Sequence, residues 1–164
     1  EHGQIIVKPS NGFGGAGVFR VSDGDTNAGV IFETLSANGS RELVIQKYVP
    51  QASIGDKRIL LLDGEVLGAV LRVHGEGDHR NNFFAGGRPQ ATEVTERDQL
   101  IVDTLAPHLR RLGLMFVGID VIGDFLIEVN VTSPTCLQEM NRLYDVQLED
   151  KVIAFVETLC GRVS

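Results

Sequence analysis

The first part of the chain alternates short apolar runs with glycine-rich or polar breaks, a pattern typical of antiparallel strands. Residues 4–8 and 18–21 predict two strands, and the glycine-rich stretch 11–17 between them predicts a hairpin tip. Apolar residues then recur at helical spacing over 26–37, with Gly39 as a stop signal. We therefore expect a hairpin followed by a short helix.

The middle of the chain predicts more antiparallel sheet. Residues 43–49 read as a strand, and two further strands, 58–62 and 66–73, flank Asp63-Gly64, a dipeptide typical of a two-residue hairpin turn. The stretch 74–90 follows, with four glycines and no sustained periodicity. So long a connection in a compact domain is unusual, and we predict a lid; the alternative is disorder without function.

A long amphipathic helix is predicted next. Thr95 and Asp98 have the spacing of a capping box, in which each residue satisfies a backbone N–H of the other. We expect one apolar helical face, made of Leu100, Ile101, Leu105, Leu109 and Leu112.

The remaining pattern predicts a second hairpin and two helices. Strands over 115–122 and 125–131 flank Gly123-Asp124, and helices are expected near 134–143 and 147–159. Together these elements indicate an α+β domain built largely of antiparallel sheet.

Lys8 and the glycines after it suggest a site for phosphate. Gly12, Gly14 and Gly17 fit G-x-G-x-x-G, but a strand follows instead of the helix that a dinucleotide fold requires. A Walker loop is excluded because Lys8 precedes the glycines. A strand lysine beside a flexible hairpin tip can bind polyphosphate. The alternative is a tight turn with a surface lysine.

Asp120, Glu128 and Asn130 are the most specific chemical signal, because they supply the hard oxygen ligands that Mg²⁺ prefers. Glu128 and Asn130 are two apart in a strand and share a face. A regular two-residue turn would place Asp120 opposite residue 127 and on the other face, so we predict a longer turn or a bulge. The alternative is a set of solvated surface charges.

Composition narrows the functional classes. The 22 Asp and Glu residues exceed the 15 Lys and Arg residues, giving a net charge of −7 that disfavours binding to nucleic acid or to an anionic membrane. No apolar run is long enough to span a bilayer. Cys136 and Cys160 lack metal-type spacing, and we expect two buried thiols. These features predict a soluble, cytoplasmic protein.

Several motifs, taken in order, resemble the ATP-grasp region of the bacterial, prokaryotic-type glutathione synthetases. They cover nearly the whole chain and are Val7-Lys8-Pro9, Gly12-Phe13-Gly14-Gly15, 46–50, 55–58, 82–87, 116–120 and 128–135. The resemblance implies an α+β ATP-grasp fold that is N-terminally incomplete. Residues 1–49 would be part of the first subdomain. Residues 50–164 would be the second, with lid loop 74–90 and metal-binding hairpin 115–131.

The resemblance also implies roles for individual residues, with ATP as co-substrate and Mg²⁺ as the metal, Mn²⁺ being an alternative. The nucleotide would contact Lys8, Gly12, Gly14, Gly15, Gln46, Lys47, Tyr48, Val49 and Asp56. The metal would be held by Asp120, Glu128 and Asn130. The catalytic arginines would be Arg58, Arg72 and Arg80, and the substrate-binding residues Asn82, Ser133 and Thr135.

The reaction that the resemblance implies is ATP-dependent ligation of γ-glutamylcysteine to glycine through an acyl phosphate, yielding glutathione, ADP and phosphate. An N-terminal portion of the enzyme would complete the site, and we expect a homo-oligomer when complete and little activity from this segment alone. Two alternatives stay open: another ATP-grasp peptide or amino-acid ligase, and a non-catalytic nucleotide-binding module.

Overall fold

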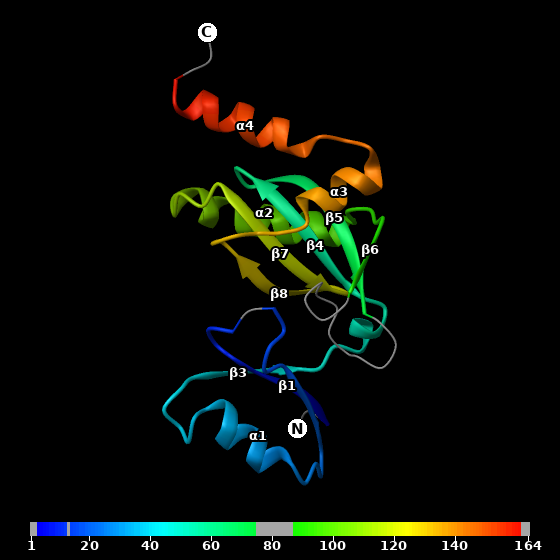
Figure 1. Ribbon diagram of the computed structural model, residues 1–164, viewed down its shortest axis with the longest axis vertical. Coiled ribbons are helices and arrows are strands. Elements are labelled where there is room, and N and C mark those ends of the chain that lie inside the picture. The colour runs from blue at the N-terminus through cyan, green and yellow to red at the C-terminus, as the bar shows by residue number, and fades with distance from the viewer. Residues whose placement is uncertain (1–2, 13, 75–86, 162–164) are drawn as a thin grey trace.

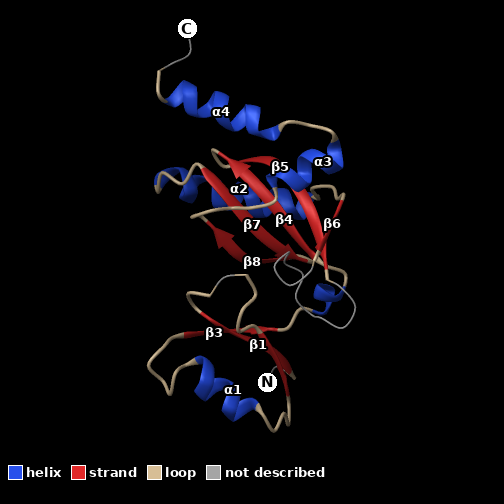
Figure 2. Ribbon diagram, in the orientation of Figure 1, coloured by secondary structure: helices blue, strands red, loops and turns tan. Residues whose placement is uncertain are grey.

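The computed structural model describes residues 3–12, 14–74 and 87–161, and its strands form two antiparallel sheets, one above the other in Figures 1 and 2. The strands are β1 (Gln4–Pro9), β2 (Phe19–Ser22), β3 (Leu43–Lys47), β4 (Asp56–Leu62), β5 (Glu65–Val73), β6 (Arg88–Gln90), β7 (Phe116–Ile122) and β8 (Phe125–Asn130). The helices are α1 (Ala28–Leu35), the 3₁₀ helix η1 (Pro50–Ser53), α2 (Glu96–Arg111), α3 (Leu137–Tyr144) and α4 (Leu148–Leu159).

The smaller sheet has the order β2-β1-β3, and it confirms the predicted hairpin of the first two strands. Val7 lies at its centre, opposite Phe19 on one side and Ile45 on the other, and is fully buried. Helix α1 lies along this sheet on the side away from the larger one (Figure 1). Gly17 has a φ of 72°, and a Cβ there would come within 3.3 Å of both Pro9 and Leu35.

The larger sheet has the order β6-β5-β4-β7-β8 and carries most of the core. Its central strand β4 is buried on both faces. Ile59 and Leu61 pack with Ile101 and Val102 of α2, whereas Leu60, on the other face, packs with the cluster that includes Met140 of α3. The sheet is therefore sandwiched between α2 and α3, with α4 beyond α3 at one end of the molecule (Figure 1).

The β4–β5 hairpin has the predicted two-residue turn, with φ values of 50° at Asp63 and 74° at Gly64. The predicted loop 74–90 needs a correction at its end. Arg88–Gln90 form the edge strand β6 because they pair with β5 from Leu71 to Val73. Residues 75–86, most of the predicted lid, lie outside the described residues.

Helix α2 has the predicted capping box between Thr95 and Asp98, but the predicted apolar face is partly wrong. Leu100 is 54% exposed and Leu112 is 66% exposed, whereas Ile101 and Leu109 are buried. Leu100 is turned by about 100° from its buried neighbour, and Leu112 lies at the C-cap, where the helix has ended.

Of the two C-terminal helices, α4 lies where it was predicted, with Gln147 as its N-cap, but α3 begins later. Helix α3 starts at Leu137 and not near 134, after Cys136 in the left-handed region with φ of 91°. Gly68 of β5 lets α3 and α4 approach the sheet, since a Cβ there would lie 2.9 Å from the Met140 sulfur. Cys136 is buried as expected, but Cys160 is exposed. Within the described ranges, every helix is too short or too polar to cross a bilayer.

Candidate nucleotide and metal site

A row of charged side chains crosses four strands of the larger sheet. Arg72 of β5 pairs with Asp56 of β4, Arg58 of β4 pairs with Asp120 of β7, and Asp120 pairs with Glu128 of β8. Partners directly opposite in antiparallel strands share a face, as do Asp56 and Arg58, which are two residues apart. We call these five residues the charged row.

Two β-bulges create this alignment. Between β7 and β8, Val121 pairs with Leu126 but Asp120 pairs with Glu128, which leaves Ile127 as the extra residue beside a two-residue turn. The predicted bulge is thereby confirmed, and Asp120 shares a face with Glu128. A second bulge between β4 and β5, which was not predicted, brings Arg72 opposite Asp56.

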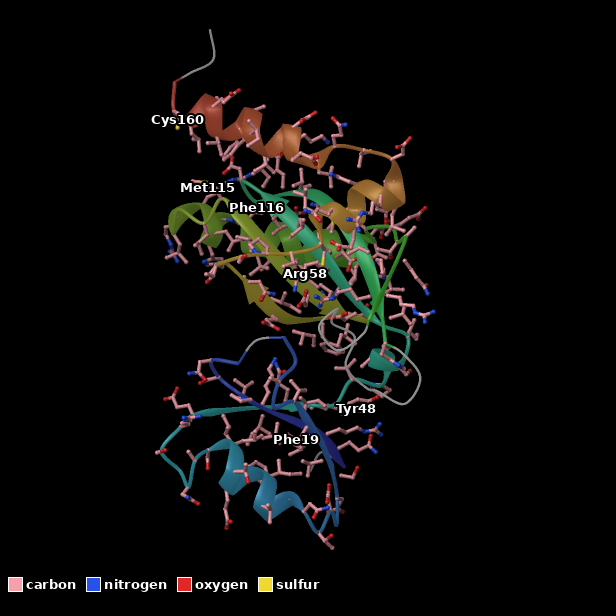
Figure 3. All side chains as sticks on the ribbon, viewed as in Figure 1. Phe19, Tyr48, Arg58, Met115, Phe116 and Cys160 are labelled. Carbon is pink, nitrogen blue, oxygen red and sulfur yellow. The ribbon has the colours of Figure 1, made fainter. Side chains whose placement is uncertain are left out.

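The arginines and aspartates of the row form a connected network. Arg58 binds Asp120 with both arms of its guanidinium, Nε at 2.5 Å from Oδ1 and Nη2 at 2.9 Å from Oδ2. Arg72 Nη2 lies 3.0 Å from Asp120 Oδ2, and Arg72 also donates to Asp56 from Nε, at 2.9 Å, and from Nη2. Arg58, Arg72 and Asp120 are all buried, and Arg58 lies within the packed side chains of the larger sheet (Figure 3).

The two aspartates of this network differ in their affinity for protons. Burial would raise the pKa of Asp120, but the hydrogen bonds and charges of Arg58 and Arg72 outweigh it and lower that pKa. At Asp56 burial dominates over the contact with Arg72, and the pKa is raised. Asp120 is therefore the carboxylate that the network holds ionised.

Asn130 and Thr135 lie against the same network. The Asn130 amide is 3.5 Å from Asp120 Oδ2; in its alternative orientation Nδ2 lies 3.0 Å from Glu128 Oε1 and Oδ1 lies 3.3 Å from Arg58 Nη2. The hydroxyl of Thr135 is 3.5 Å from Arg58 Nη1. Gly118 of β7 gives the segment after β8 room to approach, because a Cβ there would lie 2.9 Å from Pro134.

The side chains of Asp120, Glu128 and Asn130 fit a magnesium ion by donor type. The Asp120 carboxylate has about four lone-pair sites. Its arginine contacts take one site on Oδ1 and two on Oδ2, which leaves acceptor capacity on Oδ1. No group of three or more His, Cys, Asp or Glu side chains suited to a metal occurs in the described part of the chain. Two carboxylates and one amide would leave coordination positions for phosphate oxygens and water, as Mg²⁺ prefers.

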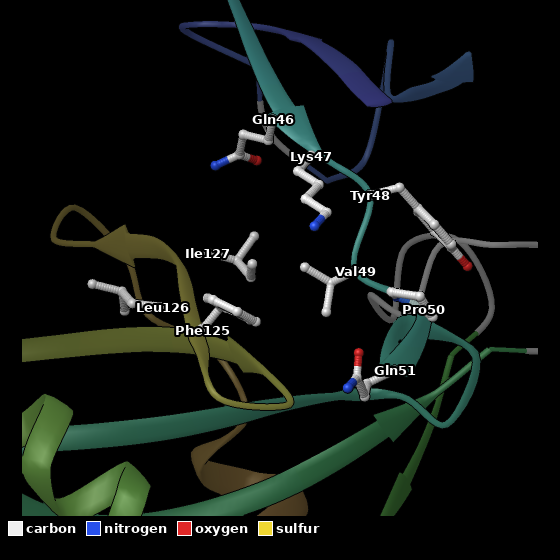
Figure 4. A pocket seen from close by; sticks show the side chains of 9 residues that line it. All are labelled: Gln46, Lys47, Tyr48, Val49, Pro50, Gln51, Phe125, Leu126 and Ile127. Atoms are coloured by element: carbon white, nitrogen blue, oxygen red, sulfur yellow. The ribbon is translucent and has the colours of Figure 1, made fainter. Parts of the chain in front are cut away.

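A pocket of about 480 Å³ opens beside the charged row, between the two sheets (Figure 4). It is lined by the end of β3, the linker to η1 and the start of β8: Gln46, Lys47, Tyr48, Val49, Pro50, Gln51, Phe125, Leu126 and Ile127. Val49 and Ile127 face each other across it (Figure 4). The sequence-based set was Gln46 to Val49; the wall from β8 was missed, although three apolar residues directly before Glu128 were a usable signal.

Lys8 lies in the smaller sheet on the same face as Gln46, because their strand partners are Val44 and Ile6. It is not among the residues that line the pocket. Gly14 and Gly15 have φ values of 64° and 74°, which suits a tight tip between β1 and β2. Contact of this lysine and of Gly12, Gly14 and Gly15 with phosphate stays a prediction.

Of the three remaining predicted site residues, only Ser133 lies in the described part of the chain. Ser133 is exposed on the segment after β8, two residues before Thr135, and has no described contact with the charged row. Arg80 and Asn82 lie outside the described residues.

Comparison with known proteins gives one consistent family. The model of the prokaryotic glutathione synthetase ATP-grasp domain matches residues 1–145. The chain is 48% identical to the glutathione synthetase of Pseudomonas aeruginosa over 93% of its length and 49% of that protein. It is 51% identical to the Neisseria meningitidis glutathione synthetase over 85% of its length and 44% of that protein. The chain thus spans about half the length of the curated relatives it matches.

Solved structures support the fold. D-cycloserine synthetase DcsG superposes with a TM-score of 0.70 at 16% identity, covering 93% of this chain and 55% of that one. A D-alanine–D-alanine ligase from Bacillus anthracis complexed with ATP gives 0.63 at 19% identity, covering 92% of this chain and 51% of that one. The ATP-grasp ligase PsnB, complexed with a precursor variant, Mg and ADP, gives 0.61 at 25% identity, covering 93% and 47%. Because the family model matches most of the chain, the chain belongs to the ATP-grasp domain family of the prokaryotic glutathione synthetases.

Proposed function

We propose that the protein containing this chain is a glutathione synthetase, an ATP-dependent ligase that joins γ-glutamylcysteine to glycine. The observation that carries the proposal is the position of the charged row beside the pocket between the sheets. Phe125 to Ile127 line the pocket and Glu128 follows directly. In this proposal a nucleotide has its base in the pocket and directs its phosphates toward Glu128 and Asp120, which the position of Ile127 in the pocket wall supports.

In this proposal the nucleotide is ATP, and Asp120, Glu128 and Asn130 hold Mg²⁺ (or Mn²⁺) against its phosphates. When bound, the metal supplies positive charge for phosphoryl transfer. Lys8 and the glycine tip of the β1–β2 hairpin bind phosphate from the side of the smaller sheet. The lysine is on the same face of that sheet as Gln46, which lines the pocket.

The proposed reaction needs no protein nucleophile, because the substrate carboxylate and the glycine amine are themselves the attacking groups. The carboxylate of γ-glutamylcysteine attacks the terminal phosphorus of ATP, ADP leaves, and the acyl phosphate forms. The glycine amine then attacks the acyl carbon, loses a proton, and expels phosphate. Arg58 and Arg72, proposed as catalytic residues together with Arg80, already bind carboxylates, which supports a role in holding Asp120 ionised and oriented.

The same proposal has three further parts. The substrate is contacted by Asn82, Ser133 and Thr135. The chain divides into subdomains 1–49 and 50–164, and the complete protein is a homo-oligomer. The relatives are about twice as long as this chain, which supports the expectation that the rest of the protein completes the substrate site. A cytoplasmic location agrees with the need for ATP.

A second candidate is an ATP-grasp ligase for a different acid and amine. It is favoured by the solved neighbours, which include D-cycloserine synthetase and D-alanine–D-alanine ligase. The nucleotide and metal residues of this chain do not discriminate between acceptors, because only the substrate side of the site differs between such reactions.

Product analysis of the full-length protein tests the proposal. With γ-glutamylcysteine, glycine, ATP and Mg²⁺ we expect glutathione, ADP and phosphate in equal amounts, and we expect Asp120→Asn to abolish turnover. Turnover only with another acid–amine pair would establish the second candidate. Binding of ATP without ADP release for any pair would establish a non-catalytic module.

A further inference from the structure

Arg20 of β2 lies on the same face of the smaller sheet as Gln46, because both residues pair with Ile6 of β1. Its guanidinium carbon is 4.2 Å from the centre of the Tyr48 ring, which is a cation–π contact. Its Nη2 also donates to Gln4 Oε1 at 2.7 Å, so the guanidinium is held from a second side. Arg20 is not among the residues that line the pocket, but it stacks on one that is.

Tyr48 is the point at which the pocket wall leaves the smaller sheet. Strand β3 ends one residue earlier, and the Tyr48 N–H donates to the Gln4 carbonyl oxygen at 3.1 Å. Val49 and Pro50 follow, and proline has no N–H with which to continue a strand ladder. The Tyr48 ring is directed away from the β8 side of the pocket, whereas Val49 faces Ile127 across it (Figure 4). The Arg20 contact therefore lies one residue from the apolar wall of the pocket.

We infer that Arg20 is a positioning residue of the nucleotide pocket, which acts through the Tyr48 ring and does not itself bind the nucleotide. The inference rests on the proposed function, because it assumes that the base of ATP lies against Val49. The contact with Arg20 holds the residues after β3 in one conformation before the nucleotide binds. Without it, these residues have to be ordered during binding, and that ordering costs affinity.

A double-mutant cycle in the full-length protein tests this arrangement. Calorimetry compares the affinities for AMP and for ATP. We expect Arg20→Ala to weaken both by the same factor, about threefold, because the contact acts on the side of the base and not on the phosphates. In the Tyr48→Leu background, which lacks the ring, Arg20→Ala should change either affinity by less than about 1.5-fold. In turnover assays of Arg20→Ala, the KM for ATP should rise about threefold while kcat changes by less than about 1.5-fold.

The matched control is Arg41→Ala, which removes an exposed arginine from the segment before β3 and should leave the affinities for AMP and ATP unchanged. A larger loss for ATP than for AMP, or an equal loss from Arg20→Ala in both backgrounds, would overturn the inference in favour of a direct contact between Arg20 and the nucleotide. Unchanged affinities in Arg20→Ala would overturn it as well.

Thermal unfolding checks that each variant is folded, and Arg20→Gln replaces Arg20→Ala in the cycle if the latter does not fold. If the wild-type protein does not bind ATP, the proposed function itself fails.

Discussion

Asp120 lies between two buried guanidinium groups, so its carboxylate neutralises charge that the larger sheet has removed from water. Replacing it with Asn would leave Arg72 with its contact to Asp56 but would remove the carboxylate that Arg58 binds with both arms of its guanidinium. We expect Asp120→Asn to lower the free energy of unfolding by about 3–5 kcal/mol, the usual cost of leaving buried charges unpaired. Urea unfolding measures the change.

The control at this scale is Asp63→Asn. Asp63 meets Arg110 at 3.4 Å, and both side chains are 44% exposed. Its loss should change the free energy of unfolding by no more than about 0.5 kcal/mol. If Asp63→Asn and Asp120→Asn lowered the free energy of unfolding equally, burial of the charged row would not explain the destabilisation.

The contacts of Asp98 make the free energy of unfolding depend on pH. Burial opposes its ionisation, but hydrogen bonds from Lys57, at 2.5 Å, and from Thr95 outweigh burial and lower the pKa below the ordinary 3.8. A carboxyl with a lowered folded pKa stabilises the protein above its unfolded pKa, and this contribution is lost as pH falls through the folded pKa. Asp98→Asn should therefore cost about 1–2 kcal/mol at neutral pH, and less as the pH approaches 2.

Urea titrations of the wild-type protein and Asp98→Asn at several pH values check this. The difference in free energy of unfolding should narrow between about pH 5 and pH 2. Contributions from Asp56 and Asp120 are common to both proteins and cancel in the difference. A constant difference across this range would show that Asp98 acts through packing and not through its charge.

At the scale of the element, the two bulged hairpins decide which side chains meet. With a regular two-residue turn, Asp56 would pair with Leu71 and Asp120 with Ile127. Each bulge adds one residue, so each hairpin turns its charged residues onto the shared face. The bulge of β8 also places Ile127 in the pocket wall.

That position makes Ile127→Ala a test of the pocket. We expect nucleotide affinity to fall on the order of tenfold, since an apolar contact with the base would be lost. The matched control is Val129→Ala on the same strand, which lies outside the pocket and should leave the affinity unchanged. Calorimetry with ATP compares the variants, and equal losses would place the base elsewhere.

At the scale of the whole molecule, the core is distributed unequally. Among the described residues, only Val7 and Val21 of the smaller sheet are buried hydrophobics, whereas the larger sheet and its helices hold all the others. Little apolar burial means a low free energy of local opening.

We therefore expect amide hydrogens of β1 to β3 to exchange faster than those of β4 and β7 in the protein without nucleotide. ATP should slow exchange in the smaller sheet most, because the pocket is lined by residues from both sheets. Hydrogen exchange with mass spectrometry measures both effects. Equal protection in the two sheets before ATP is added would contradict this view of the core.

Local patterns predicted much of this molecule, and long-range register explains the rest. The capping box of Thr95 and Asp98 and the turn at Asp63-Gly64 depend on residues that are close in the sequence, and both were predicted correctly. The facing of Asp120 could be inferred because a shared metal requires it. The contact between Asp56 and Arg72 could not, since it depends on a bulge in β5 that no turn or charge signals. Periodicity alone also did not separate Leu100 from Ile101, because both are apolar and adjacent.

Gly118 has a consequence for how this domain can evolve. The segment carrying Ser133 and Thr135 is close to β7 because position 118 has no side chain, and a single added methyl group would meet Pro134 at 2.9 Å. The same methyl group would also come within 3.3 Å of Arg58 Cδ and 3.4 Å of Arg58 Nη1, so it would press both on the residues proposed to meet substrate and on the arginine that binds Asp120. Any residue larger than glycine at position 118 would therefore disturb the proposed substrate side and the proposed metal side together, and a lineage that acquires a new acceptor should do so by changes elsewhere.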